Sequence, residues 1–124
     1  MKPKENPSVL LLNSRFFGVY MHDFEGNFLD ANDAALNRLG YSREEIHSVN
    51  IASLLREEDL EKALAALKEI KESGQQKVLT RYRLRSKQGD LVWVDTEGFL
   101  VHREGRPYAI QGIARDVTDQ IRAE

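Results

Sequence analysis

The sequence has no cysteine, three prolines, one tryptophan and no long apolar run. Without cysteine the chain forms no disulfide, no thiolate metal site, no cysteine nucleophile and no cysteinyl adduct. Its purely apolar runs, such as Val9–Leu12, are all far too short for a transmembrane helix or for the core of a signal peptide. We therefore expect a cytoplasmic location and no membrane contact by this segment.

Charge of one sign is also lacking, because 18 lysines and arginines face 20 aspartates and glutamates, a net charge of −2. Nothing global therefore draws the chain to nucleic acid or to an anionic membrane. What the chain does have is the composition of an ordinary globular protein, with 41% hydrophobic residues among 124. This length corresponds to one domain with a single core of modest size.

The hydrophobic pattern changes period along the chain and predicts both helices and strands. Asn32 and the Ser42–Glu45 capping box predict helix starts, and Gly40 and Gly74 predict helix ends. The strands are expected at 16–22, 28–31, 78–85, 91–102 and 108–117, and the helices at 8–13, 33–39, 44–47 and 57–73. Strands at both ends with helices between them indicate an α+β fold, one antiparallel sheet with helices packed on one face.

The later strands present two apolar faces. The residues expected to face inward are Tyr82, Leu84, Val92, Val94, Ile110 and Ala114. The opposite face mixes charges with a large apolar set: Leu79, Trp93, Phe99, Val101 and Ile113. A contiguous apolar patch of this kind marks contact with something else. We expect it to be covered by the N-terminal helix, by a second copy of the chain, or by both.

No catalytic motif is present. The sequence has no GxSxG, no GxGxxG, no P-loop and no cluster of metal ligands. The acidic run Glu57–Asp59 suits the first turn of a helix, where the helix dipole favours negative charge. A basic stripe from Lys77 to Lys87 has few aromatic neighbours, so a solvated or partner-facing strand explains it better than nucleic-acid binding. We predict that this segment is not an enzyme and binds no nucleic acid.

The motifs "NDAALNRLGYSREEI", "YRLRSKQGDLVWVD" and "GIARDVTDQIRAE", in this order, resemble PAS sensory domains of the bacterial S-box type. The resemblance covers the chain from about residue 12 to its end. It implies a five-stranded antiparallel sheet in the order 2-1-5-4-3, with the helices cupped over one face. It also implies a lead-in with a short flanking helix at 1–13, a PAS domain at 14–118 and the start of a signalling helix at 119–124.

Asp116-Val117-Thr118 matches the Asp-Ile-Thr signature that joins the last strand of such domains to a signalling helix. From the residues, Thr118 can cap the first turn of that helix and Asp116 can hydrogen-bond across the junction. The resemblance implies a covalently linked output domain, such as a histidine kinase or a diguanylate cyclase, and a change relayed through the last strand. A homodimer is also expected.

Similar domains bind haem, flavin, a small carboxylate or a fatty acid between the sheet and the long helix, and others bind nothing. Cysteine-dependent flavin photochemistry is excluded here, and non-covalent flavin stays open. Haem held by a histidine of the long helix is not expected, because 57–73 has no histidine. The identity of any cofactor is therefore left unassigned.

The candidate pocket residues are Tyr20, His22, Leu64, Leu67, Thr80, Tyr82, Thr96 and Ala114. Two interpretations of the first strand conflict. Alternation makes Phe17, Val19 and Met21 the core set, whereas the resemblance turns Tyr20 and His22 toward the cavity. His47 and His102 are expected to face solvent. The two functions left open are ligand sensing with relay into the following helix, and a ligand-free dimerisation module.

Overall fold

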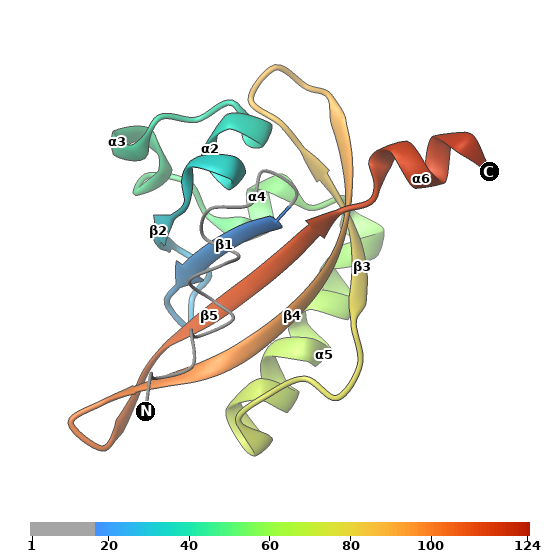
Figure 1. Cartoon of the computed structure of the whole chain (residues 1–124). Coiled ribbons are helices and arrows are strands. Elements are labelled where there is room, and N and C mark those ends of the chain that lie inside the picture. Colours follow the sequence, from blue (N-terminus) through green and yellow to red (C-terminus); the bar gives the residue numbers. More distant parts are fainter. Residues whose placement is uncertain (1–16) are drawn as a thin grey trace, which may run out of the picture.

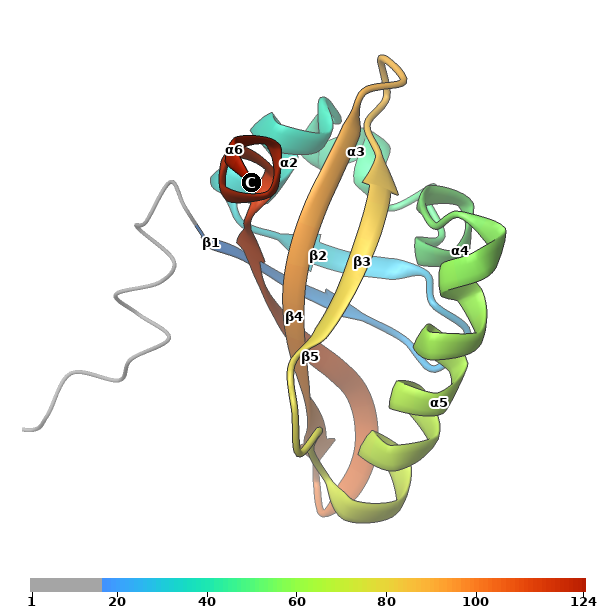
Figure 2. The same ribbon diagram turned by 90° about the vertical axis from the view of Figure 1, so that its right-hand side faces the viewer.

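The computed structural model describes residues 17–124, which Figures 1 and 2 show in two views at right angles. The strands are β1 (Phe17–His22), β2 (Phe28–Ala31), β3 (Thr80–Arg85), β4 (Leu91–Arg103) and β5 (Arg106–Asp116). The helices are α2 (Asp33–Leu39), α3 (Arg43–Ile46), α4 (Ile51–Leu54), α5 (Glu57–Ser73) and α6 (Thr118–Ala123). The helix expected at 8–13 lies outside the described residues.

The five strands form one antiparallel sheet in the order β2-β1-β5-β4-β3, which confirms the predicted fold and topology. β5 lies in the middle, between β1 and β4 (Figure 1). α3, α4 and α5 lie on one side of the sheet (Figure 2). α6 continues from the end of β5 and points away from it (Figure 1). None of the helices in residues 17–124 is long and apolar enough to span a membrane.

The helix boundaries follow from local chemistry that the sequence already displays. The Asn32 side chain accepts from the amide of Ala35 at the start of α2, and Gly40 ends this helix with φ 82°. Ser42 and Glu45 form the predicted capping box. α5 spans the predicted residues and ends at Gly74, whose φ of 92° suits glycine. α4 was not predicted, because its four residues show no periodicity.

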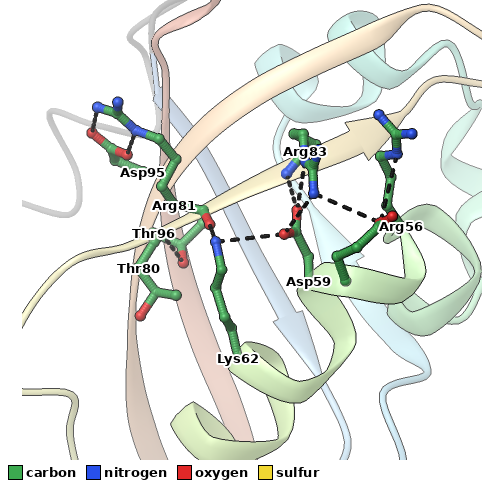
Figure 3. A network of polar contacts seen from close by, with 9 residues as sticks. Arg56, Asp59, Lys62, Thr80, Arg81, Arg83, Asp95 and Thr96 are labelled. Carbon is green, nitrogen blue, oxygen red and sulfur yellow. Dashed lines mark hydrogen bonds and ion pairs between the residues drawn. The ribbon is translucent and has the colours of Figure 1, made fainter.

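The first turn of α5 is fastened to the edge strand β3 (Figure 3). Asp59, only 1% exposed, accepts from the backbone amide of Arg83 at 2.7 Å and from its guanidinium at 3.2 and 3.3 Å. Lys62 lies 3.5 Å from Asp59 and donates to the carbonyl of Arg81 at 3.0 Å. The helix thus satisfies backbone groups that an edge strand would leave to solvent.

The other edge of the sheet is covered in a similar way. The backbone amide of Phe28 in β2 donates to the carbonyl of Val49, and the guanidinium of Arg43 donates to the carbonyl of Ala31 at 2.8 Å. Arg43 also pairs with Asp30 at 2.7 Å. Both outer strands therefore bond to other parts of their own chain.

The predicted inward set is confirmed. Tyr82, Val92, Val94 and Ile110 are buried, and Leu84 and Ala114 pack against the first three of these. The strand expected from residue 78 begins only at Thr80, however, and Val78 and Leu79 are 73% and 60% exposed. The amide of Gln76 bonds to the carbonyl of Gly98, so the chain after α5 already lies beside β4, but the regular pairing of β3 with β4 begins only at Thr80.

Candidate ligand cavity and strand–helix junction

A cavity of about 230 Å³ lies between the sheet and the helices. All five strands and the helices α2 to α5 contribute to its wall, which is mostly aliphatic and aromatic. Ligand sites are typically concave and apolar with a few polar groups that orient the ligand. The cavity therefore has the form of a binding site for a small molecule.

Two glycines make room for this cavity on the floor of the sheet. Gly112 of β5 pairs with Tyr20 of β1 on one side and with Gly98 of β4 on the other. A Cβ atom at position 112 would overlap the ring of Tyr20, and one at position 98 would lie 2.6 Å from Cδ1 of Ile70. Glycine inside a strand often marks a close approach of this kind. The ring of Tyr20 thus lies across the neighbouring strand because that strand has no side chain there.

Tyr20 and His22 both line the cavity, together with Phe28 of β2. The rings of Tyr20 and His22 stack with centroids 6.0 Å apart, and Phe28 meets both edge-on at 6.0 and 6.5 Å. The alternation argument for β1 was wrong, and the resemblance placed these two side chains correctly. Alternation fails because β1 is an inner strand with apolar residues on both faces, and Val19 on its other face is only 6% exposed.

Within residues 17–124, only one ring nitrogen of His22 has a hydrogen-bond partner. Its Nδ1 lies 2.8 Å from the carbonyl oxygen of Asp23, and a carbonyl only accepts, so Nδ1 carries the proton. Burial lowers the pKa of His22 below its ordinary value, although the carbonyl and carboxylate of Asp23 act in the opposite direction. The ring is therefore neutral near pH 7, and Nε2 is a hydrogen-bond acceptor. His47 and His102 are both exposed, as predicted.

The two tyrosines of the cavity stay protonated at any physiological pH. Burial raises the pKa of Tyr20, and the nearby Tyr82 raises it further. Burial also raises the pKa of Tyr82 to about 12, although a hydrogen bond with Thr80 lowers it. Both phenols are therefore neutral groups that can donate a hydrogen bond.

Of the remaining residues predicted for the pocket, four lie on the cavity wall and Thr80 does not. Leu64 and Leu67 of α5, Thr96 of β4 and Ala114 of β5 line the cavity, although Leu64 is 58% exposed and lies at its rim. The hydroxyl of Thr96 is occupied, because it donates to the carbonyl of Thr80 at 3.1 Å. Thr80 is not on the wall, and its own hydroxyl accepts from Gln76 at 3.0 Å. Its predicted place in the pocket is corrected accordingly.

The junction between β5 and α6 is held by Asp116 and Thr118: Asp116 hydrogen-bonds across it as predicted, whereas the predicted cap by Thr118 does not form. Oδ1 of Asp116 accepts from the amide and the hydroxyl of Thr118 at 2.9 and 2.6 Å. The Thr118 hydroxyl in turn accepts from the amide of Trp93 in β4 at 2.9 Å. Thr118 is thus the first residue of α6 and makes no cap, since the helix begins after Val117. Its hydroxyl ties the helix start to β4.

Arg38, which the sequence did not single out, completes this junction. Its Nε lies 2.5 Å from Oδ2 of Asp116, and its Nη2 lies 3.5 Å from the Thr118 hydroxyl. Burial raises the pKa of Asp116, but hydrogen bonds from Thr118 and Arg38 and the charge of Arg38 outweigh burial and lower the pKa overall. Arg38 and Asp116 also line the cavity. The end wall of the cavity and the start of α6 therefore share the same ion pair.

The predicted outer patch lies on the sheet face opposite the cavity. Trp93, Phe99, Val101 and Ile113 are half-buried there, and Leu79 is exposed beside them. Arg83 covers part of the Trp93 ring, with its guanidinium carbon 5.5 Å from the ring centroid. The basic stripe is largely paired, because Arg81 bonds to Asp95 at 2.7 and 3.0 Å and Arg83 bonds to Asp59.

Dimerisation through this patch stays a prediction. We expect Trp93→Ala to weaken self-association about tenfold, because buried tryptophans contribute most to interfaces of this type. Light scattering over a dilution series measures the mass, and Leu64→Ala on the opposite side is the matched control. A monomer at every concentration, in the unchanged chain as in the variant, would contradict the prediction.

The comparisons with known proteins agree with this architecture. A family model described as PAS fold matches residues 28–114. The chain therefore belongs to the PAS fold family, as the sequence motifs indicated.

Known relatives lie in bacterial signalling proteins. A domain of a sensory box sensor histidine kinase/response regulator from Geobacter sulfurreducens is 29% identical, with a TM-score of 0.70 over 90% of this chain and 92% of that one. A PAS domain from Colwellia psychrerythraea is 20% identical, with a TM-score of 0.76 over 91% and 95% of the two chains. The probable diguanylate cyclase DgcE of Escherichia coli is 29% identical over 108 residues, which cover 86% of this chain and 10% of that protein.

The cavity also limits which cofactors fit. A volume of about 230 Å³ is below the ~300 to 1,000 Å³ usual for drug-sized ligands. Haem and flavins are built from several linked or fused rings and need more space than this cavity offers. The cavity therefore fits neither group. Of the histidines in the described part, His22 is the one on the cavity wall, and its Nδ1 is already bonded to a carbonyl.

Proposed function

We propose that this chain is a sensory input domain that binds a small molecule in the cavity and relays its presence through β5 into α6. The relay ends in an output domain of histidine kinase or diguanylate cyclase type that follows in the parent protein. The observation that carries the proposal is the double role of Arg38 and Asp116, which line the cavity and hold the start of α6.

The physical route is short. β5 is the central strand, and its last residue, Asp116, accepts two hydrogen bonds from the first residue of α6. A ligand in the cavity that shifts β5 relative to α2 changes the geometry between Arg38 and Asp116, and the carboxylate then changes its hold on Thr118. Small shifts at such a packed junction become rotations or displacements of the helix that follows.

We expect Asp116→Ala to free α6 from the sheet. Charge-assisted hydrogen bonds contribute more than neutral ones, and about 1.4 kcal/mol of lost junction energy makes amide exchange in α6 about tenfold faster. Hydrogen-exchange mass spectrometry of residues 118–124 measures the effect. Asp116→Asn keeps an acceptor for Thr118 but loses the ion pair with Arg38, and should give an intermediate rate.

The matched control is Asp119→Asn, an exposed carboxylate in the first turn of the same helix. It should leave the exchange of α6 unchanged. In the full parent protein, Asp116→Ala should alter output activity several-fold, while Asp119→Asn does not. Equal output from the unchanged protein and from both variants would refute the relay.

A further inference from the structure

The polar groups on the cavity wall are mostly occupied. The side chains of Asn50, Gln76 and Thr96 all donate to backbone carbonyls of the chain. The hydroxyl of Tyr20 and Nε2 of His22, in contrast, make no hydrogen bond with any other of residues 17–124. Within the same residues, every side-chain nitrogen or oxygen that is fully buried has a hydrogen-bond partner, so an atom without one is accessible. Both atoms are therefore reachable, and both belong to residues of the cavity wall.

These two atoms define the polar complement of a ligand at the end of the cavity formed by Tyr20, His22 and Phe28, and the Tyr82 hydroxyl is a further neutral group on the wall. Nε2 of the neutral His22 accepts, so the ligand must offer an N–H or O–H donor there. The Tyr20 hydroxyl donates or accepts as needed. The stacked rings of Tyr20 and His22, with Phe28 edge-on to both, provide an aromatic surface beside those atoms. A flat ring suits that surface, since aromatic pairs gain energy beyond the area that they bury.

The charged residues on the cavity wall disfavour an ionised ligand. Arg38 is the one lysine or arginine among the described wall residues, and its guanidinium is already 2.5 Å from Asp116. The other charged wall residues, Glu25 and Asp116, are acidic. An unpaired charge is expensive to bury in an apolar cavity. A carboxylate would have to take Arg38 from Asp116, so a neutral molecule is favoured.

The volume of the cavity limits the size of the ligand. The cavity holds about 230 Å³, and a cavity of about 150 Å³ already binds benzene. One substituted ring, or two fused rings, fills the available space.

We propose that the cavity takes a small neutral ring compound with one N–H or O–H donor, which lies against Tyr20, His22 and Phe28 and donates to Nε2 of His22. This ligand class rests on the proposed sensory function and deepens it.

Four probes of similar size separate the contributions. Phenol and indole are neutral rings with a donor, toluene is a neutral ring without one, and benzoate is an anion. Saturation-transfer NMR detects binding, and amide chemical shifts of the labelled domain during titration give the dissociation constants. We expect phenol and indole to bind about five- to tenfold more tightly than toluene, the value of one hydrogen bond. Benzoate should bind more weakly than phenol.

The variant His22→Phe keeps a ring of similar size and removes the acceptor. It should bring phenol and indole down to the affinity of toluene and leave toluene unchanged. Tyr20→Phe, which keeps the stacked ring, is a second variant and should lower phenol affinity by a smaller factor. His47→Phe is the matched control, because His47 is exposed and is not part of the cavity wall.

Three results would overturn the ligand class: benzoate binding as tightly as phenol, an unchanged ratio of phenol to toluene in His22→Phe, or no binding by any probe. Each leaves the relay separately testable, because the effect of Asp116→Ala on α6 and on output needs no added ligand. Conversely, binding of phenol with no effect of Asp116→Ala would uphold the ligand class and refute the relay.

Discussion

The Asp59→Ala variant is expected to be less stable than the unchanged domain by about 3 kcal/mol, because it removes a buried carboxylate that accepts charge-assisted hydrogen bonds from a backbone amide and a guanidinium. The Asp59 side chain is 2% exposed, its carboxylate accepts from both the backbone and the side chain of Arg83, and Lys62 lies 3.5 Å away. Without it, these groups lose their partner at the edge of the sheet. For a domain of this size the melting temperature should fall by about 10 °C, measured by circular dichroism.

The adjacent carboxylate offers a matched control. Glu58 stands in the same turn and 3.7 Å from Arg83, but its side chain is 67% exposed. Exposed ion pairs contribute about 0 to 1 kcal/mol, so Glu58→Ala should change stability little. Equal losses for the two variants would show that the general charge of the helix start, and not the buried contact, stabilises this region.

The Asp59 carboxylate gives the stability of the domain a predictable pH dependence. Burial raises the pKa of Asp59, but hydrogen bonds from Arg83 and the charges of Lys62 and Arg83 lower it more, so the folded pKa lies below the ordinary value. A lowered folded pKa means that stability is present above the unfolded pKa of about 3.9 and is lost as the pH falls through the folded value. The stability difference between the unchanged domain and Asp59→Asn should therefore be constant from pH 5 to 7, on the order of 1 to 2 kcal/mol, and shrink below about pH 4.

Gly112→Ala is expected to lower the free energy of unfolding by about 2 kcal/mol, within the usual range for an extra methyl group in a packed interior. The new methyl would overlap the Tyr20 ring, which lies across the strand at this point. The ring would have to leave its position beside His22, and phenol binding should weaken with it. Chemical denaturation and the NMR titration measure the two effects on one sample.

A double-mutant cycle separates the overlap from a general defect of the strand. Tyr20→Leu removes the outer ring atoms that a methyl at 112 would meet. In that background Gly112→Ala should cost less than about 0.5 kcal/mol, a strong departure from additivity. If the cost is the same in both backgrounds, the tyrosine ring is not the reason for glycine at this position.

The fold could be predicted almost completely because its signals are local and repeated. The period of α5 and Gly74 defined that helix to the residue. The capping box of Ser42 and Glu45 formed as predicted. The strand order came from the resemblance to PAS domains, since strand length and alternation alone leave the pairing of distant strands undetermined.

The candidate site was less predictable, because it depends on contacts between residues far apart in the chain. Arg38 and Asp116 are 78 residues apart, and nothing in the period of α2 distinguishes Arg38 from a solvated side chain. In the sequence nothing distinguishes Asp59 from its neighbours Glu57 and Glu58. Its role depends on the edge strand β3, which lies beside it only in the folded domain. A signal for the cavity floor was present in Gly98 and Gly112, since glycine inside long strands indicates a close approach.

The covered outer strands restrict how two copies of this chain can assemble. The amide of Arg83 and the carbonyl of Arg81 are occupied by α5, and at the opposite margin the amide of Phe28 is occupied by Val49. A second copy therefore finds no open backbone ladder along these stretches with which to build a continuous intermolecular sheet. Pairs of this domain should associate through the sheet face that carries Trp93 and Phe99, an arrangement that brings the central strands of the two copies, each with Ile113 on this face, close together.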